Sequence, residues 1–224
     1  MKLVITCEHG GNEIPEKFHT LFSNKEILNT HRGYDLGALD VFNTLKHLAI
    51  YTNYSTTSRL FIELNRSLWH KNLFSDFTKK LSDLEKKDII KTYYNIYRKS
   101  VENEIETLIT NQNTVVHLSI HSFTPILNDS VRNCDIGLLY DSSNQQEKKI
   151  ALQLKEALHR INSKWHVRFN YPYLGKADGF TTYLRKRFKE NYIGIEIEIN
   201  QKYSKKNIMN SQLKEDLQKA IASL

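Results

Sequence analysis

Apolar and polar positions follow two different periods along the chain, and these periods predict its helices and strands. Short apolar runs bounded by polar or glycine residues predict β-strands, and apolar residues spaced three to four positions apart predict helices. The predicted strands cover residues 2–7, 58–64, 114–121, 135–140, 164–169 and 192–199. The predicted helices cover residues 35–48, 76–111, 145–162, 178–190 and 210–223, with a break in the second near Asp83 or Lys87.

Strands that alternate with helices predict an α/β fold with a mostly parallel sheet covered on both faces. The last predicted strand, YIGIEIEIN, is unusual because its four isoleucines face one side while Gly194, Glu196 and Glu198 face the other. A buried row of carboxylates is very costly unless the acids are paired or serve a site. These acids therefore either lie on an exposed edge strand or belong to a functional site.

Length and composition are those of one globular domain spanning residues 1–224. The chain has 40% hydrophobic and 11% aromatic residues, which excludes an intrinsically disordered protein. Its first residues lack the pattern of a signal peptide, and no stretch approaches the roughly 20 apolar residues of a membrane span. Two cysteines in a chain of this size favour a reducing compartment, so we expect a cytoplasmic protein.

The net charge of +7 and pI near 9.2 raise the question of nucleic-acid binding. The lysines are spread along the chain and stand near acids in segments of helical period, such as KKLSDLEKKDIIK. This pattern is typical of a solvated helix face. We therefore do not expect a nucleic-acid or membrane partner, and the charge favours attraction of small anionic substrates instead.

The opening stretch ITCEHGGNEIP brings His9 and Glu13 close together at the end of the first strand. The two glycines between them and Pro15 argue for a loop rather than a helix. A catalytic zinc ion takes three protein ligands from His, Glu and Asp and keeps a water in the fourth position. His9 and Glu13 supply two candidate ligands, and His121, at the end of VVHLSIHSF, supplies the third. The alternative is that these are buried, hydrogen-bonded histidines, as we expect for His117 deeper in the same strand.

Two further groups could complete such a site. Asn65 and Arg66 follow the apolar run of SRLFIELNRS, where the predicted strand ends. The planar arginine side chain suits recognition of a carboxylate, although a surface salt bridge is the alternative. Glu196 or Glu198 beside a metal would be a natural general base for the bound water.

Seven segments together make the chain resemble the N-formylglutamate amidohydrolase family. In order they are HGGNEIP, HRGYDLGA, SRLFIELNR, SIHSF, DIGLLYD, YPYLGKADGFTTYLR and GIEIEINQ. The resemblance implies a three-layer α/β/α sandwich like that of the zinc carboxypeptidases. It also implies a zinc-dependent amidohydrolase that removes an N-acyl group, most simply N-formyl, from a small acidic amino acid such as N-formylglutamate. The alternatives are a carboxypeptidase-like metallopeptidase and a non-catalytic small-molecule binding protein.

The resemblance also implies roles for individual residues. It gives His9, Glu13 and His121 as ligands of one Zn²⁺ per chain, with Asn12 as the alternative to Glu13. On this basis the two glycines let the loop turn tightly enough for His9 and Glu13 to reach one ion.

For the substrate, the resemblance gives Asn65 and Arg66 as the pair that meets a carboxylate. Glu198 is the implied general base, and Glu196, two residues away on the same face, is the alternative. Arg59 and Arg185 are candidate second clamps for the substrate.

Overall fold

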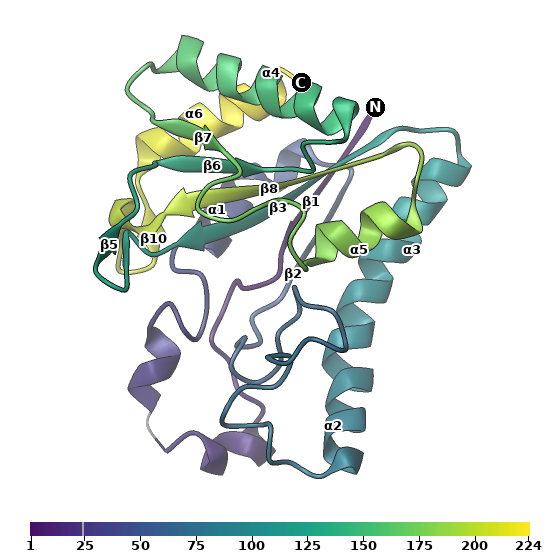
Figure 1. Ribbon diagram of the computed structural model, residues 1–224, viewed down its shortest axis with the longest axis vertical. Coiled ribbons are helices and arrows are strands. Elements are labelled where there is room, and N and C mark those ends of the chain that lie inside the picture. The colour runs from purple at the N-terminus through teal and green to yellow at the C-terminus, as the bar shows by residue number, and fades with distance from the viewer. Residues whose placement is uncertain (24) are drawn as a thin grey trace.

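A computed structural model describes residues 1–23 and 25–224, and its centre is a six-stranded sheet (Figure 1). The strand order is β2-β1-β3-β8-β6-β7. All neighbouring pairs are parallel except β6 and β8, which are antiparallel. The strands are β1 (Lys2–Cys7), β2 (Tyr51–Tyr54), β3 (Val115–Phe123), β6 (Ile136–Leu139), β7 (Val167–Phe169) and β8 (Tyr192–Asn200).

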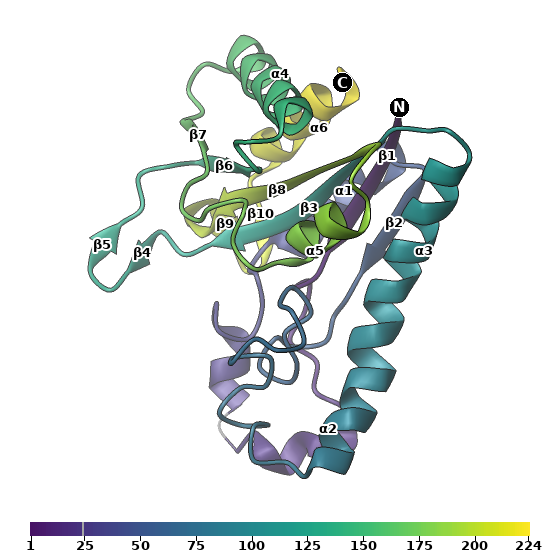
Figure 2. The same cartoon turned by 45° about the vertical axis from the view of Figure 1, so that its right-hand side comes forward.

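Helices cover both faces of this sheet, which confirms the predicted three-layer α/β/α architecture (Figure 2). One face packs against α1 (Ala38–Leu45), α4 (Gln145–Ile161) and α6 (Ser211–Ala222). The four isoleucines of β8 belong to that apolar layer, as their alternation predicts. The opposite face packs against α3 (Ile96–Thr110) and α5 (Phe180–Arg187).

The long predicted helix over 76–111 begins later than its periodicity indicates. Helix α2 (Asp83–Ile89) starts at Ser82, whose hydroxyl accepts from the Glu85 amide while the Glu85 carboxylate accepts from the Ser82 amide. This capping box satisfies two backbone donors that would otherwise lack partners. The helix then continues through a π-helical segment (Ile90–Asn95) into α3, so the predicted break near Asp83 marks its start.

The predicted strand over 58–64 is wrong. Its apolar residues Leu60, Phe61, Ile62 and Leu64 are all buried, so the run does not alternate between two faces. The chain instead turns after Ser58, whose backbone carbonyl accepts from the Phe61 amide at 2.9 Å. The edge strand next to β1 is β2, which the sequence did not predict. The strand predicted over 164–169 is shorter in the structure, where it is β7.

The remaining elements are short. There are 3-10 helices at Glu16–Leu21, Lys25–Asn29, Lys46–Leu48 and Gln201–Tyr203. Two small antiparallel ribbons are formed by β4 (Ile126–Leu127) with β5 (Ser130–Val131), and by β9 (Ser204–Lys205) with β10 (Ile208–Met209).

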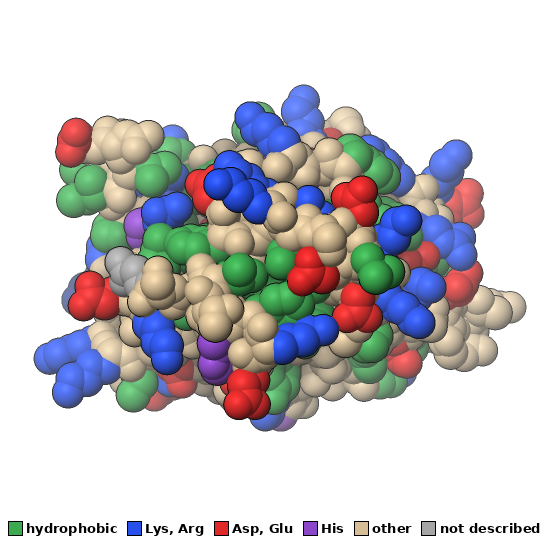
Figure 3. Space-filling view, turned by 90° about the horizontal axis from the view of Figure 1, so that it is seen from below, with side chains coloured by type: hydrophobic (Ala, Val, Ile, Leu, Met, Phe, Trp, Pro, Cys, Tyr) green, Lys and Arg blue, Asp and Glu red, His purple; other side chains and the backbone are tan. Residues whose placement is uncertain are grey.

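The helix lengths and the surface charges concern the two partners that the sequence argues against, a membrane and a nucleic acid. Among the described residues, no helix combines the length and the apolar character that crossing a bilayer requires. On the face seen in Figure 3, lysine and arginine side chains are interspersed with aspartate and glutamate. This mixture agrees with the solvated helix faces that the sequence predicts.

Candidate metal centre and active site

The register of the sheet brings polar side chains from three neighbouring strands onto one face. In the β3–β8 pair, Ser119 lies opposite Glu196, and His121 lies opposite Glu198. On the other side of β3, Glu8 directly follows β1, and its carboxylate contacts both Ser119 and His121. These strands run parallel, so their carboxyl ends meet at one edge, where ligands bind in α/β sheets.

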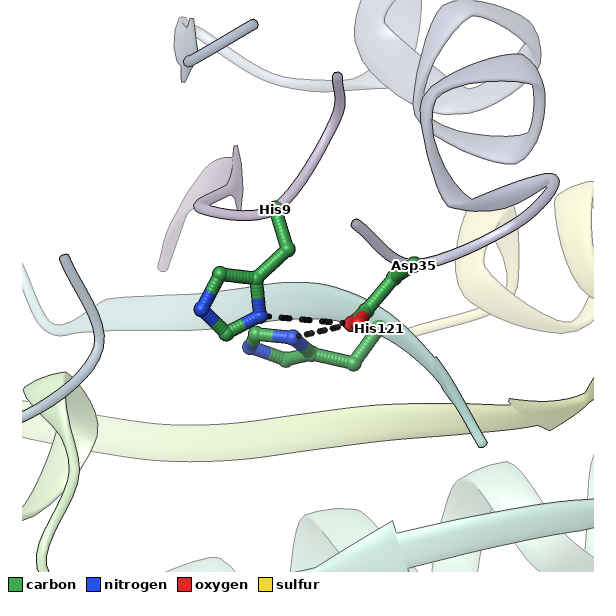
Figure 4. Close-up of side chains that lie close together, drawn as sticks. All are labelled: His9, Asp35 and His121. Carbon is green, nitrogen blue, oxygen red and sulfur yellow. Dashed lines mark hydrogen bonds and ion pairs between the residues drawn. The ribbon is translucent and has the colours of Figure 1, made fainter. Parts of the chain in front are cut away.

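Three buried groups meet at this edge: His9, Asp35 and His121 (Figure 4). Asp35 Oδ2 lies 2.9 Å from His121 Nδ1 and 3.4 Å from His9 Nδ1. One ligand atom from each residue can be chosen so that all three lie within 4.8 Å of one another. Two imidazoles and a carboxylate are the donor set of many catalytic zinc sites, which keep a fourth position open. The residues present therefore fit a divalent metal ion.

The pKa values of the three side chains in the cluster are shifted by burial and by their charged neighbours. Burial alone would raise the pKa of Asp35, but His9, His121 and Arg59 hold it well below its usual range. Burial likewise opposes a charged His121, yet its contacts with Asp35 and Glu8 raise its pKa well above the usual value. The pKa of His9 is raised in the same way, by Glu63 and Asp35 against burial and the charge of Arg59.

A second carboxylate lies behind each histidine. His9 Nε2 is hydrogen-bonded to Glu63, and His121 Nε2 lies 3.1 Å from Glu8 Oε2. Arg59 joins the two sides of the His9 environment: it donates to Glu63 Oε2 through Nη2 at 2.7 Å and to Asp35 Oδ1 through Nη1 at 3.1 Å. The guanidinium that the sequence offered as a substrate clamp is thus engaged by two protein carboxylates.

Glu198 and Glu196 differ in how their carboxylates are engaged. Glu198 is 5% exposed, and its Oε2 is a buried oxygen without a hydrogen-bond partner among the described residues. Burial raises its pKa to about 8, with Asp35 and Glu196 adding to the rise and His121 opposing it. Glu196 Oε1, by contrast, accepts from the Thr181 hydroxyl at 2.6 Å. Glu198 is therefore the acid of the two with a buried oxygen that no described donor engages.

A pocket of about 170 Å³ opens onto this cluster, and Asn65 and Arg66 line it. Arg66 donates through Nη1 to the backbone carbonyl of Asp178, and among the described residues no carboxylate forms an ion pair with it. Asn65 Oδ1 accepts from the Phe180 amide at 2.7 Å, at the start of α5. Arg66 is thus the guanidinium that remains able to meet an anionic ligand in the pocket.

The structure places Glu13 outside this cluster. Its side chain is exposed, and Oε2 accepts from the Thr56 hydroxyl at 2.6 Å. Asn12, the alternative ligand, donates instead to Asn29 Oδ1 at 2.9 Å. The structure thus does not bring Glu13 beside His9, and Asp35 lies beside the two histidines instead.

The Gly10–Gly11 pair consequently has a different role from the one predicted. A Cβ at Gly10 would lie 2.9 Å from the Ser55 carbonyl oxygen, and one at Gly11 would lie 2.6 Å from the Thr56 carbonyl oxygen. The glycines therefore permit close packing of the loop against residues 55–56, where the Gly10 amide donates to the Ser55 carbonyl at 2.9 Å.

Arg185 and His117 also lie away from the pocket. Arg185 donates to Glu147 Oε1 at 2.7 Å and to the Gly194 carbonyl at 2.8 Å, so it ties α5 to α4 and β8. His117 is fully buried between Thr6 and Tyr192, and burial lowers its pKa to about 4. Its expected structural character agrees with this environment, whereas Arg185 is not among the pocket residues.

Sequence reasoning missed Asp35, Glu63 and Glu8. Asp35 lies within HRGYDLGA and Glu63 within SRLFIELNR, so both stood in segments that already carried the family resemblance. Asp35 was expected to begin a helix, where an acid is explained by the helix dipole alone. Helix α1 in fact begins at Ala38, and this leaves Asp35 in the preceding turn with its carboxylate facing the histidines.

Comparisons with known proteins agree with this picture. A family model described as N-formylglutamate amidohydrolase matches residues 1–204. A gene product of Agrobacterium tumefaciens with a known crystal structure is 25% identical and has a TM-score of 0.81, over 99% of this chain and 91% of that one. An N-formylglutamate amidohydrolase from Ralstonia eutropha JMP134 shares the fold at 17% identity and a TM-score of 0.75, over 100% of this chain and 92% of that one.

No curated protein matches the chain significantly. The match of the family model confirms the resemblance drawn from the sequence segments, and it indicates an enzyme that hydrolyses an amide bond. The chain belongs to the N-formylglutamate amidohydrolase family.

Proposed function

We propose that this chain is a zinc-dependent amidohydrolase that removes an N-acyl group, most simply N-formyl, from a small acidic amino acid such as N-formylglutamate. The observation that carries this proposal is the buried His9–Asp35–His121 cluster beside the unpartnered carboxylate of Glu198. Family membership supports amide hydrolysis, and the geometry supports the division of roles described below.

His9, Asp35 and His121 are the proposed ligands of one zinc ion. The Nδ1 atoms of both histidines approach the same oxygen of Asp35, so all three groups can face one ion. A bound zinc ion polarises a carbonyl and lowers the pKa of its water ligand to about 7. Arg59 holds the other oxygen of Asp35, which supports a positioning role for this arginine rather than a contact with substrate.

Glu198 is the proposed general base. A base must lie within about 2.6–3.2 Å of the group whose proton it takes, directly or through one water. Glu198 lines the same pocket as His9 and His121, and it lies beside His121 in the sheet. The Oε2 atom of Glu198 has no hydrogen-bond donor among the described residues, which leaves it free to accept a proton from water and return it to the leaving amine.

Arg66 is the proposed anchor for a substrate carboxylate, with Asn65 beside it. A guanidinium forms two parallel hydrogen bonds with a carboxylate, which fixes the orientation of the amide relative to the cluster. The pocket has a volume of about 170 Å³, which is small for a ligand site and suits a single acylated amino acid better than a peptide.

We also propose a cytoplasmic location. Cys7 and Cys134 are both buried and unpaired, as is usual where thiols are kept reduced.

The test is a substrate screen with zinc-loaded protein. N-formyl, N-acetyl and N-succinyl derivatives of glutamate, aspartate and glutamine, and a dipeptide with a free carboxyl end, are incubated with the enzyme, and the released amine is measured. We expect hydrolysis of an N-formyl acidic amino acid that is lost with chelator and restored by zinc. Exclusive cleavage of the dipeptide would favour a peptidase, and no cleavage of any compound at full zinc occupancy would contradict the proposal.

A further inference from the structure

Each histidine of the cluster uses its two ring nitrogens for different partners. In His121, Nδ1 lies 2.9 Å from Asp35 Oδ2, while Nε2 lies 3.1 Å from Glu8 Oε2. In His9, Nδ1 faces the same Asp35 oxygen and Nε2 is hydrogen-bonded to Glu63. The two rings are therefore arranged alike, each between Asp35 on one side and its own second carboxylate on the other.

This arrangement determines which nitrogen can bind a metal ion. An ionised carboxylate only accepts hydrogen bonds, and in the metal-free protein both ring nitrogens of each histidine face one: Asp35 at Nδ1, and Glu8 or Glu63 at Nε2. Asp35 lines the pocket, whereas Glu8 and Glu63 are not among its lining residues. A cation that binds beside Asp35 on the pocket side would therefore replace the proton at Nδ1, while Nε2 would keep its hydrogen bond to Glu8 or Glu63. A carboxylate behind a metal-binding histidine commonly fixes ring orientation and tautomer in this way.

Glu8 is a buried carboxylate that is held by hydrogen bonds from its neighbours. It is fully buried, and the Tyr97 hydroxyl donates to its Oε1 at 2.8 Å. Its Oε2 accepts from the Ser119 hydroxyl and faces His121 Nε2. Because burying a carboxylate is costly without such partners, its position directly behind His121 points to a role in that contact.

Glu63 is held just as firmly. Its Oε2 accepts from Arg59 Nε at 3.0 Å and Nη2 at 2.7 Å, and its Oε1 accepts from the Asn65 amide at 3.0 Å. The carboxylate is 7% exposed, so it has little freedom to turn away from His9.

We propose that Glu8 and Glu63 are positioning residues that fix His121 and His9 so that both present Nδ1, beside Asp35, to a divalent cation. The inference rests on the proposed function, since it concerns the same metal. It goes further in assigning the two ligating nitrogens and the residues that select them.

The test measures metal affinity rather than activity. Glu8→Gln and Glu63→Gln keep the size of the side chain but remove its charge and one acceptor oxygen. Zn²⁺ and Co²⁺ dissociation constants are measured by competition with a chromophoric chelator, and the visible spectrum of the Co²⁺ protein is recorded. We expect each variant to bind about 10- to 100-fold more weakly and to show an altered Co²⁺ spectrum.

Two further variants separate positioning from general destabilisation. Glu147→Gln is the matched control, because Glu147 is also fully buried but holds Arg185 and faces neither histidine. We expect its metal affinity to stay within about twofold of wild type. Tyr97→Phe removes one hydrogen bond to Glu8 without removing the charge, so it should weaken affinity less than Glu8→Gln, and it carries the test if Glu8→Gln does not fold.

The outcomes are distinct. Wild-type protein that binds Zn²⁺ or Co²⁺ together with folded Glu8 and Glu63 variants of unchanged affinity and spectrum would overturn this inference alone. Wild-type protein that binds neither cation would overturn the proposed function as well.

Discussion

Replacing Glu198 by glutamine removes the proposed general base while preserving its size. Glu198 is nearly buried, lies opposite His121 in the sheet, and has an unpartnered Oε2 among the described residues. None of the His9, Asp35 and His121 ligand atoms depends on it for a hydrogen bond. We therefore expect Glu198→Gln to bind zinc as the wild type does and to lose turnover.

The expected loss follows from the usual contribution of general acid–base catalysis. That contribution is roughly 10²–10⁴-fold in rate, or about 3–5 kcal/mol in the activation barrier. The assay is formate release from an N-formyl amino acid at saturating substrate, with zinc content measured on the same samples. Because the change acts on the chemical step, kcat should fall while substrate affinity changes little.

Glu196→Gln is the matched control for this experiment. Glu196 lines the same pocket, but its Oε1 is held by the Thr181 hydroxyl. Residues two apart on a strand are separated by about 6.6 Å along it, so one acid alone can reach a given water. We expect less than about a tenfold loss in this variant. Turnover that survives in Glu198→Gln and collapses in Glu196→Gln would refute the assignment and move the base to Glu196.

Three further predictions concern other parts of the site. Arg66→Lys keeps the charge but loses the two-pronged geometry, so kcat/KM for a carboxylate-bearing substrate should fall about 10- to 100-fold, a cost of about 1.5–3 kcal/mol; an equal loss with the corresponding carboxamide would contradict a carboxylate contact. Glu13→Ala should leave the zinc dissociation constant unchanged, because Glu13 is exposed and bonded to Thr56; weaker zinc binding would restore it as a ligand. In metal-free protein, burial raises the pKa of Glu198 to about 8, compared with about 4.5 in the unfolded chain. The protonated carboxyl group therefore stabilises the fold fully below about pH 4.5, and this stabilisation is lost as the pH rises through about 8. Urea unfolding should therefore show that Glu198→Gln gains stability relative to wild type across that range, and a constant difference would contradict the raised pKa.

Some of this site could be predicted from the sequence because strand periodicity determines which side chains share a face. The alternation in YIGIEIEIN correctly separates the apolar face of β8 from the face that carries Glu196 and Glu198. The same alternation in β3 places His117 and His121 on one face, with His121 nearer the ligand-binding edge. What periodicity alone leaves open is the order of strands, and the interior position of β8 is what excludes a solvent-exposed row of acids.

Asp35 and Glu63, which the sequence did not identify, lie in irregular segments, where side chains do not follow a helix or strand period. Asp35 lies in a turn before α1, and Glu63 lies in the buried segment that was predicted as a strand. Their positions are determined by tertiary contacts, such as the Asp35 amide donating to the His9 carbonyl at 3.0 Å. The short spacing between His9 and Glu13 along the chain favoured Glu13 as the metal ligand instead. In the structure, Gly10 and Gly11 pack closely against residues 55–56, and the Glu13 side chain accepts a hydrogen bond from Thr56.

The central claim is that His9, Asp35 and His121 together hold the catalytic metal ion. The most direct measurement is a crystal structure of zinc-loaded protein with anomalous data collected on both sides of the zinc absorption edge. We predict one strong anomalous peak per chain, about 2.0–2.2 Å from Nδ1 of His9, Nδ1 of His121 and a carboxylate oxygen of Asp35. A fully zinc-loaded protein with its peak elsewhere, or with Glu13 in place of Asp35 around the ion, would contradict this account.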